Sequence, residues 1–118
     1  MPRDPCAYLR DILEAAAAID EATGAIDEAT YTCTRLIRSS VEREFIIIGE
    51  ALKVIAQRDP QLFARIPEGR QIIDFRNLLT HAYVNVSDRV VWGAIKTDLP
   101  LLVEACGRLL RQIKGPAA

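Results

Sequence analysis

The chain has 118 residues, which is long enough for one domain that buries an apolar core without disulfides or a structural metal. Half of the residues are hydrophobic, and 15 Lys and Arg nearly balance 16 Asp and Glu. This balance argues against binding nucleic acid through bulk positive charge, so any such activity must be local or shared between subunits. The apolar runs are also too short to cross a membrane.

The ends and the cysteines place few further constraints. Residues 1–5 are polar and no apolar leader follows, so we expect a cytoplasmic protein. The chain has an odd number of cysteines and no C-x-x-C pair among them; they are Cys6, Cys33 and Cys106. This pattern predicts that the cysteines are reduced thiols. With one histidine and no recognisable ligand spacing, neither a metal nor another cofactor is expected.

The first element is a helix over residues 4–23. Asp4 can cap it, Pro5 occupies its first position, and Gly24 follows as a stop. Apolar residues recur every three or four positions, as on one face of a helix. Residues 25–30 are expected to form a connector or a short helical turn.

A long helix is predicted over residues 31–58, ending at Asp59-Pro60. Residues 45–49 are apolar around the whole circumference of this helix, and a helix of that kind is covered on more than one side. A short buried strand would also explain three consecutive isoleucines, but the flanking residues favour a helix. We therefore expect one side to face the core and another to face a second subunit.

Residues 61–66 are expected to form a short turn. Pro67 is then expected to begin a third helix that reaches about Tyr83. A polar break follows at residues 85–87. Ser87 or Asp88 can cap a fourth helix.

Asp98-Leu99-Pro100 resembles a cap followed by a helix start, and residues 115–118 are expected to fray. A regular apolar seam follows that start, formed by Leu99, Leu102, Cys106, Leu109 and Ile113. No strand pattern appears. The prediction is one domain over residues 1–118, an all-α antiparallel bundle of four to five helices.

The third helix carries the residues with the clearest chemistry. His81, the only histidine, can accept or donate a proton near neutral pH, and Arg76 can hold phosphate oxygens. Such a pair can cleave RNA without a metal. Asn77 can orient the imidazole, and Tyr83 can stack on a base. Taken singly, each residue also has an ordinary structural explanation as a cap, a surface group or a packing group.

On an ideal helix, Arg76 and Tyr83 share one side, whereas Asn77 and His81 share another, and Arg76 and His81 diverge by about 140°. If Arg76 and His81 serve one phosphate, either the helix unwinds near His81 or a second copy completes the site. Leu78 would be an exposed apolar residue unless a partner covers it, which also favours a dimer.

Glu50 follows the apolar run of the second helix. It can pair with Arg76 or Arg43, or lie on a solvated edge, and we favour pairing as a supporting role for the site.

Residues 76–83 resemble the R-x4-H-x-Y signature of the HepT-like branch of HEPN-domain proteins. Ala82 is the one departure, since relatives often have glycine there. The resemblance extends over nearly the whole chain, through residues 8–14, 41–43, 47–51, 90–92 and 98–100.

The resemblance implies an all-helical homodimer that acts as the toxin of a type VII-like HEPN/nucleotidyltransferase toxin–antitoxin pair. Arg76 and His81 would be the catalytic residues of a metal-independent endoribonuclease, in a cleft at the dimer interface, with Asn77 in support. The substrate would be RNA, with tRNA and mRNA both open. The cognate minimal nucleotidyltransferase antitoxin would neutralise the toxin by transferring AMP to Tyr83.

Two alternatives remain open. The chain can be a non-catalytic nucleotide-binding or adaptor subunit of a nucleotidyltransferase, using Arg76 and Tyr83 to hold a nucleotide. It can also be a structural helical dimer with a decayed motif.

Overall fold

The computed structural model describes residues 3–81 and 86–114, which contain helices and no strand. The elements are α1 (Pro5–Thr23), α2 (Glu28–Cys33), α3 (Arg35–Arg58), α4 (Pro60–Phe63), α5 (Gly69–Thr80), α6 (Asp88–Gly93), the π-helical turn η1 (Ala94–Asp98) and α7 (Leu99–Lys114). Because α6, η1 and α7 follow one another without a break, the bundle has four long helical segments. The predicted all-α bundle is confirmed.

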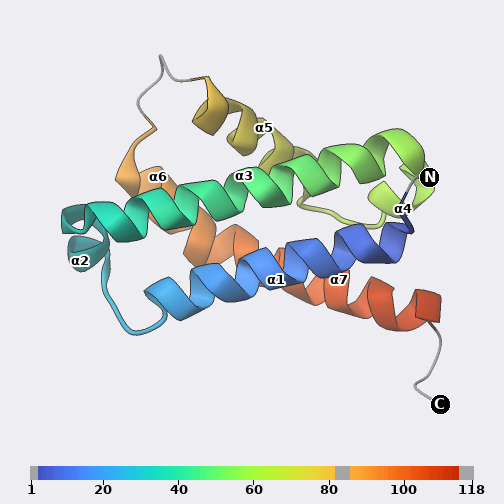
Figure 1. The fold of residues 1–118 in the computed structure, drawn as a ribbon, viewed down its shortest axis with the longest axis horizontal. Coiled ribbons are helices and arrows are strands. Elements are labelled where there is room, and N and C mark those ends of the chain that lie inside the picture. The colour runs from blue at the N-terminus through green and yellow to red at the C-terminus, as the bar shows by residue number, and fades with distance from the viewer. Residues whose placement is uncertain (1–2, 82–85, 115–118) are drawn as a thin grey trace.

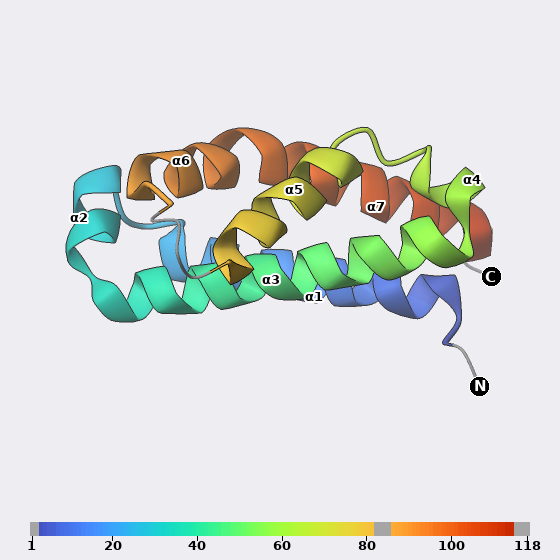
Figure 2. The ribbon, with the colours of Figure 1, turned by 90° about the horizontal axis from the view of Figure 1, so that it is seen from above.

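The long helices are arranged around one core. α1 and α3 lie side by side, α7 packs against α1, and α5 crosses α3 obliquely (Figures 1 and 2). The short helices α2 and α4 lie near opposite ends of α3 (Figure 1). This arrangement leaves one long side of α3 without a helix packed over it.

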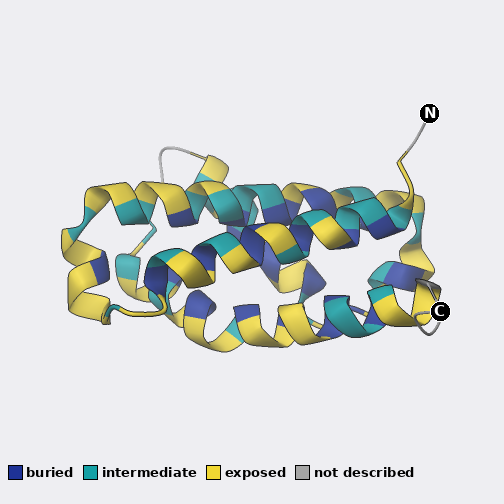
Figure 3. Cartoon of the chain, turned by 60° about the horizontal axis from the view of Figure 1, so that its bottom comes forward, coloured by how far each residue is buried: buried dark blue, intermediate teal, exposed yellow. Residues whose placement is uncertain are grey.

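The apolar stripes of the helices meet in this core. Buried residues on the long helices form bands that face inward, while the outward faces are exposed (Figure 3). Phe45 of α3 and Phe75 of α5 make an edge-to-face contact with ring centroids 5.1 Å apart. This contact fixes α5 on α3 immediately before Arg76 in the chain.

The predicted first helix is correct, and its cap is the one expected. The Asp4 carboxylate accepts a hydrogen bond of 2.8 Å from the backbone N–H of Cys6, and Pro5 is the first helical residue. The helix ends at Thr23, before Gly24.

The predicted helix over residues 31–58 is wrong at its beginning. The chain forms α2 first, breaks at Thr34, whose ψ of 94° is extended, and starts α3 at Arg35. The break turns α2 so that Tyr31 is fully buried, with its ring centroid 5.5 Å from that of Trp92. The Tyr31 ring thereby leaves water and packs against the half-buried Trp92, which favours the break.

The third predicted helix is shorter at both ends than expected. Pro67 lies in a turn, and α5 begins at Gly69 and ends at Thr80 instead of reaching Tyr83. The stretch predicted as a turn over residues 61–66 includes most of the short helix α4, which the Asp59 carboxylate caps by accepting from the N–H of Leu62.

The expected cap at residues 98–100 is also wrong, because the helix continues through it. Pro100 has no N–H to donate, and the chain accommodates it with a π-helical turn in which Leu99 N–H bonds to the carbonyl of Ala94. The apolar seam of α7 is buried as predicted except at Ile113, which is 47% exposed. Residues 115–118, expected to fray, lie outside the described residues.

Within the described part of the chain, none of the helices combines the length and apolar character that a bilayer span needs.

Candidate functional site

Arg76 lies directly against the backbone of α3. A Cβ atom placed on Gly49 would lie 2.3 Å from Cβ and 2.5 Å from Cγ of Arg76, which is closer than atoms can approach. The arginine stem therefore occupies the space that any other residue at position 49 would need. Gly49 is buried, and it allows α5 to pack closely enough to place the guanidinium beside the next residue of α3.

Two polar groups orient the Arg76 guanidinium. Its Nη2 forms an ion pair with the carboxylate of Glu50, and its Nη1 donates a hydrogen bond of 2.9 Å to Oδ1 of Asn77. The Arg76 side chain is 17% exposed, and its Nε is buried without a hydrogen-bond partner among the described residues. Of the alternatives for Glu50, the pairing with Arg76 is the one observed.

His81 is the first residue after α5. Its ψ of 90° is extended, and its N–H donates a hydrogen bond of 3.2 Å to the carbonyl of Asn77. The ideal-helix angle between Arg76 and His81 therefore does not apply, because the helix has ended. The helix ends at the place where the first of the two predicted arrangements requires it to unwind, and completion of the site by a second copy stays a prediction.

Asn77 connects the two ends of the motif. Its side chain accepts from Arg76, while its backbone carbonyl accepts from both His81 N–H and the Thr80 hydroxyl. His81 itself is exposed, so its imidazole is open to a substrate. Arg76, Asn77 and His81 form a connected unit, and Glu50 joins it from α3.

Tyr83, the residue expected to receive AMP, lies outside the described residues, as does Ala82. The predicted alignment of Tyr83 with Arg76 assumed that α5 continues to Tyr83, and the helix ends three residues earlier.

Gly49 is the site residue that sequence reasoning missed. The apolar run predicted at residues 45–49 includes this glycine, but only as part of a surface for core and dimer contacts. A glycine inside a helix costs stability relative to alanine. Its presence between Ile48 and Glu50 was the available signal that another backbone or side chain approaches closely.

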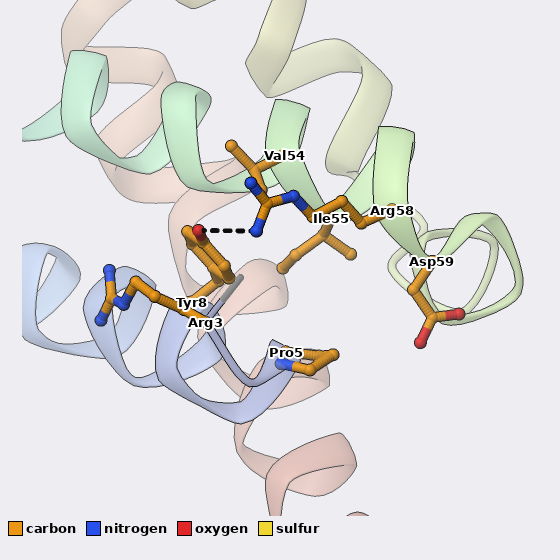
Figure 4. A pocket seen from close by; sticks show the side chains of 7 residues that line it. All are labelled: Arg3, Pro5, Tyr8, Val54, Ile55, Arg58 and Asp59. Carbon is orange, nitrogen blue, oxygen red and sulfur yellow. Dashed lines mark hydrogen bonds between the residues drawn. The ribbon is translucent and has the colours of Figure 1, made fainter. Parts of the chain in front are cut away.

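A larger cleft than the one beside α5 lies away from this unit. It has a volume of about 760 Å³ and lies between the start of α1 and the end of α3, where Arg58 Nη1 approaches the Tyr8 hydroxyl at 3.4 Å (Figure 4). The Arg3 guanidinium lies 4.8 Å from the centroid of the Tyr8 ring and forms an ion pair with Asp11. None of its lining residues belongs to the R-x4-H-x-Y stretch, so cleft size does not identify the candidate site.

A smaller cleft of about 220 Å³ adjoins the outer side of α5. Leu78 and Val90 line it and are 46% and 54% exposed, which confirms that Leu78 is uncovered in the single chain. Its titratable lining residues are Asp74 and Asp98. Burial raises the pKa of the Asp98 carboxyl above its ordinary value.

Nothing in the described residues groups three or more His, Cys, Asp or Glu side chains as metal ligands.

The described residues form a small helical protein in which α5 carries a largely buried arginine and ends before an exposed histidine. Residues 12–109 match the family described as ribonuclease HepT-like. A protein of Thermococcus cleftensis named as a probable ribonuclease HepT is 38% identical over 86% of this chain and 92% of its own. A protein of Methanocaldococcus jannaschii, named as a presumed RNase, is 35% identical over 83% of this chain and 89% of its own.

The chain therefore belongs to the HepT-like ribonuclease family. No solved structure gives a significant match. The resemblance inferred from residues 76–83 is confirmed at the level of the family.

Proposed function

We propose that this chain is a metal-independent endoribonuclease and acts as the toxin of a HEPN/nucleotidyltransferase toxin–antitoxin pair in the cytoplasm. The observation that carries the proposal is the connected unit of Arg76, Asn77 and His81. Membership of a ribonuclease family supports the reaction class, since relatives carry ribonuclease names.

Each residue has a definite task in this reaction. Arg76 holds the non-bridging oxygens of the scissile phosphate, and Asn77 and Glu50 keep its guanidinium in place. An imidazole at His81 removes the proton of the ribose 2′-hydroxyl, whose oxygen attacks phosphorus and expels the 5′-oxygen. The expelled oxygen takes up a proton from water, the imidazolium returns its proton to solvent, and the products are a 2′,3′-cyclic phosphate and a 5′-hydroxyl.

The proposed site lies at the interface of a homodimer. In the single chain the positive charge of Arg76 is balanced by Glu50, and His81 is open to solvent. A second copy would exclude water from this region and strengthen the contacts to phosphate.

RNA cleavage by the purified protein in EDTA tests the reaction, with His81→Ala and Arg76→Ala as comparisons. We expect both variants to lose at least about 100-fold in rate, as for removal of a proton-transfer or charge-stabilising group. Gln71→Ala is the matched control, since Gln71 is exposed on the same helix and lies outside the unit of Arg76, Asn77 and His81. Equal cleavage by wild type, His81→Ala and Arg76→Ala would remove this mechanism.

We further propose that a cognate minimal nucleotidyltransferase, the antitoxin, neutralises the protein by transferring AMP to the Tyr83 hydroxyl. The added phosphate is an anion that can pair with Arg76 and take the place of the substrate phosphate. Tyr83→Phe should then remain toxic when the partner enzyme is co-expressed. Restored growth of that strain would contradict the role of Tyr83.

The alternative, a non-catalytic nucleotide-binding or adaptor subunit, predicts no growth defect when the chain is expressed alone. The toxin proposal predicts growth arrest that His81→Ala relieves. A small nucleotidyltransferase in the neighbouring reading frame would support both of these and oppose a merely structural dimer.

A further inference from the structure

The outer side of α3 carries a stripe of residues that the described part of the chain leaves exposed or half-buried. We define the outer stripe as Leu36, Arg43, Ile47, Glu50 and Val54, which on an ideal helix lie within about 40° of Leu36. Leu36 is 83% exposed, Arg43 and Glu50 are exposed, and the other two are half-buried. A stripe that combines uncovered apolar side chains with charged ones is typical of a protein interface.

The two charges of the outer stripe cannot satisfy each other within one chain. Arg43 and Glu50 are seven residues apart, a rise of about 10.5 Å along the helix. Arg43 has no ion-pair partner in residues 3–81 and 86–114. The Glu50 side chain is 49% exposed even though it pairs with Arg76, so a group outside the chain can reach its carboxylate.

An antiparallel second copy of α3 matches these charges. Arg43 and Glu50 are equidistant from the point between Ile46 and Ile47. A two-fold axis at that point places Arg43 of each copy opposite Glu50 of the other, so both pairs form at once. The two isoleucines, each half-buried in the single chain, then lie at the centre of the contact.

The same side of α3 has room for side chains from a partner. A hollow of about 270 Å³ lies between α1 and α3 and is lined in part by Tyr8, Ile46, Ile47, Glu50 and Val54. This hollow has a mainly apolar lining and adjoins the outer stripe. A partner packed against the stripe would remove water from it.

The other uncovered apolar face fits a second copy less well. The cleft beside Leu78 and Val90 has Asp74 and Asp98 as its titratable lining residues. A two-fold axis there would bring carboxylates together without a matching cation from this lining. Of the two predicted dimer faces, charge complementarity favours α3.

We propose that a second copy of this chain packs antiparallel along the outer stripe, and that Arg43 of the partner subunit thereby joins the site at Glu50. This deepens the proposed function and rests on it only for the role of Arg76. In the single chain Glu50 neutralises Arg76, whereas the added arginine leaves the group of three with a net positive charge. The dimer therefore binds phosphate better than the isolated chain does.

Charge reversal on each side of the contact provides the test. Arg43→Glu alone places two pairs of carboxylates in the homodimer, and Glu50→Arg alone places two pairs of arginines. Mixing the two variants restores both opposite-charge pairs in a heterodimer. Sedimentation equilibrium measures the dissociation constants of the two variant homodimers and of their heterodimer. One of the two chains carries a tag, so that the three dimers differ in mass.

We expect a wild-type dimer, at least about a tenfold weaker homodimer for each variant, and a heterodimer close to wild-type affinity. Arg111→Glu on α7 is the matched control for a changed surface charge. If circular dichroism shows that Glu50→Arg has lost helix, Glu50→Gln replaces it, and its mixture with Arg43→Glu should still bind more tightly than Arg43→Glu alone.

A monomeric wild type, an Arg43→Glu variant that dimerises like wild type, or a mixture no tighter than its components would overturn the proposal. Sedimentation does not depend on catalysis. A protein that passes this test but does not cleave RNA would therefore refute the nuclease proposal and support the interface. A protein that cleaves RNA but fails this test would support the nuclease proposal and refute the interface.

Discussion

Gly49 of α3 contacts the side-chain stem of Arg76 of α5, and no space remains between them for another atom. A Cβ atom at position 49 would lie 2.3 Å from Arg76 Cβ. The glycine is therefore part of the candidate site although it has no side chain, because it determines how closely the arginine approaches Glu50.

Gly49→Ala should damage both stability and activity. The new methyl group forces Arg76 or α5 to move, and overpacking of this kind costs about 1–3 kcal/mol of unfolding free energy. RNA cleavage should fall because the guanidinium leaves its position beside Glu50. Urea unfolding and a cleavage assay measure the two effects.

Gly93→Ala is the matched control for that prediction. Gly93 ends α6 with helical backbone angles, and a Cβ placed there meets no atom within 4 Å. We expect this variant to gain about 0.5–1 kcal/mol, since alanine loses less backbone entropy on folding. Equal destabilisation by both substitutions would contradict the role assigned to Gly49.

His81→Ala and Arg76→Ala should separate catalysis from stability. His81 is exposed and its backbone hydrogen bond does not need the imidazole, so its removal should change the unfolding free energy by no more than about 0.5 kcal/mol. Arg76→Ala also empties the space over Gly49 and leaves Glu50 unpaired, which should cost about 1–3 kcal/mol. A large stability loss for His81→Ala would indicate a structural histidine.

The unfolding free energy should carry a pH-dependent contribution from Glu42. Burial, and next the neighbouring carboxylate of Asp88, raise the pKa of Glu42 above its ordinary value of 4.5, while Arg38 opposes them. The folded state therefore binds this proton more tightly than the unfolded state does. Its contribution to stability is fully present below the ordinary pKa and is lost as pH rises through the raised one.

Glu42→Gln should consequently be more stable than wild type at neutral pH, with the difference shrinking toward pH 4.5. Urea unfolding at several pH values measures that difference, with Glu14→Gln on the exposed side of α1 as control. A difference between wild type and Glu42→Gln that grows as pH falls would show that the sign is wrong.

The three cysteines should react at very different rates with an aromatic disulfide reagent. Cys33 is exposed, whereas Cys6 and Cys106 are buried, and burial raises the pKa of the Cys106 thiol to about 12. One thiol should react quickly in the folded protein and all three in urea. Cys33→Ser should abolish the fast phase, and a fast phase that survives it would mean that a buried thiol is accessible.

Local sequence patterns determined much of this protein. Asp4 and Pro5 set the start of α1, the apolar periodicity set the core faces of the long helices, and the R-x4-H-x-Y stretch identified the family. These features depend on residues near one another in the chain, so spacing and capping chemistry predict them.

Tertiary packing decided the features that the sequence alone could not. The break at Thr34 depends on the burial of Tyr31 against Trp92, and the end of α5 changes the angle between Arg76 and His81. The position of the Arg76 side chain depends on Gly49 and Glu50, which lie more than 25 residues earlier in the chain. Helical periodicity places a side chain on a face, but only the packing of two helices determines which backbone lies close enough to orient it.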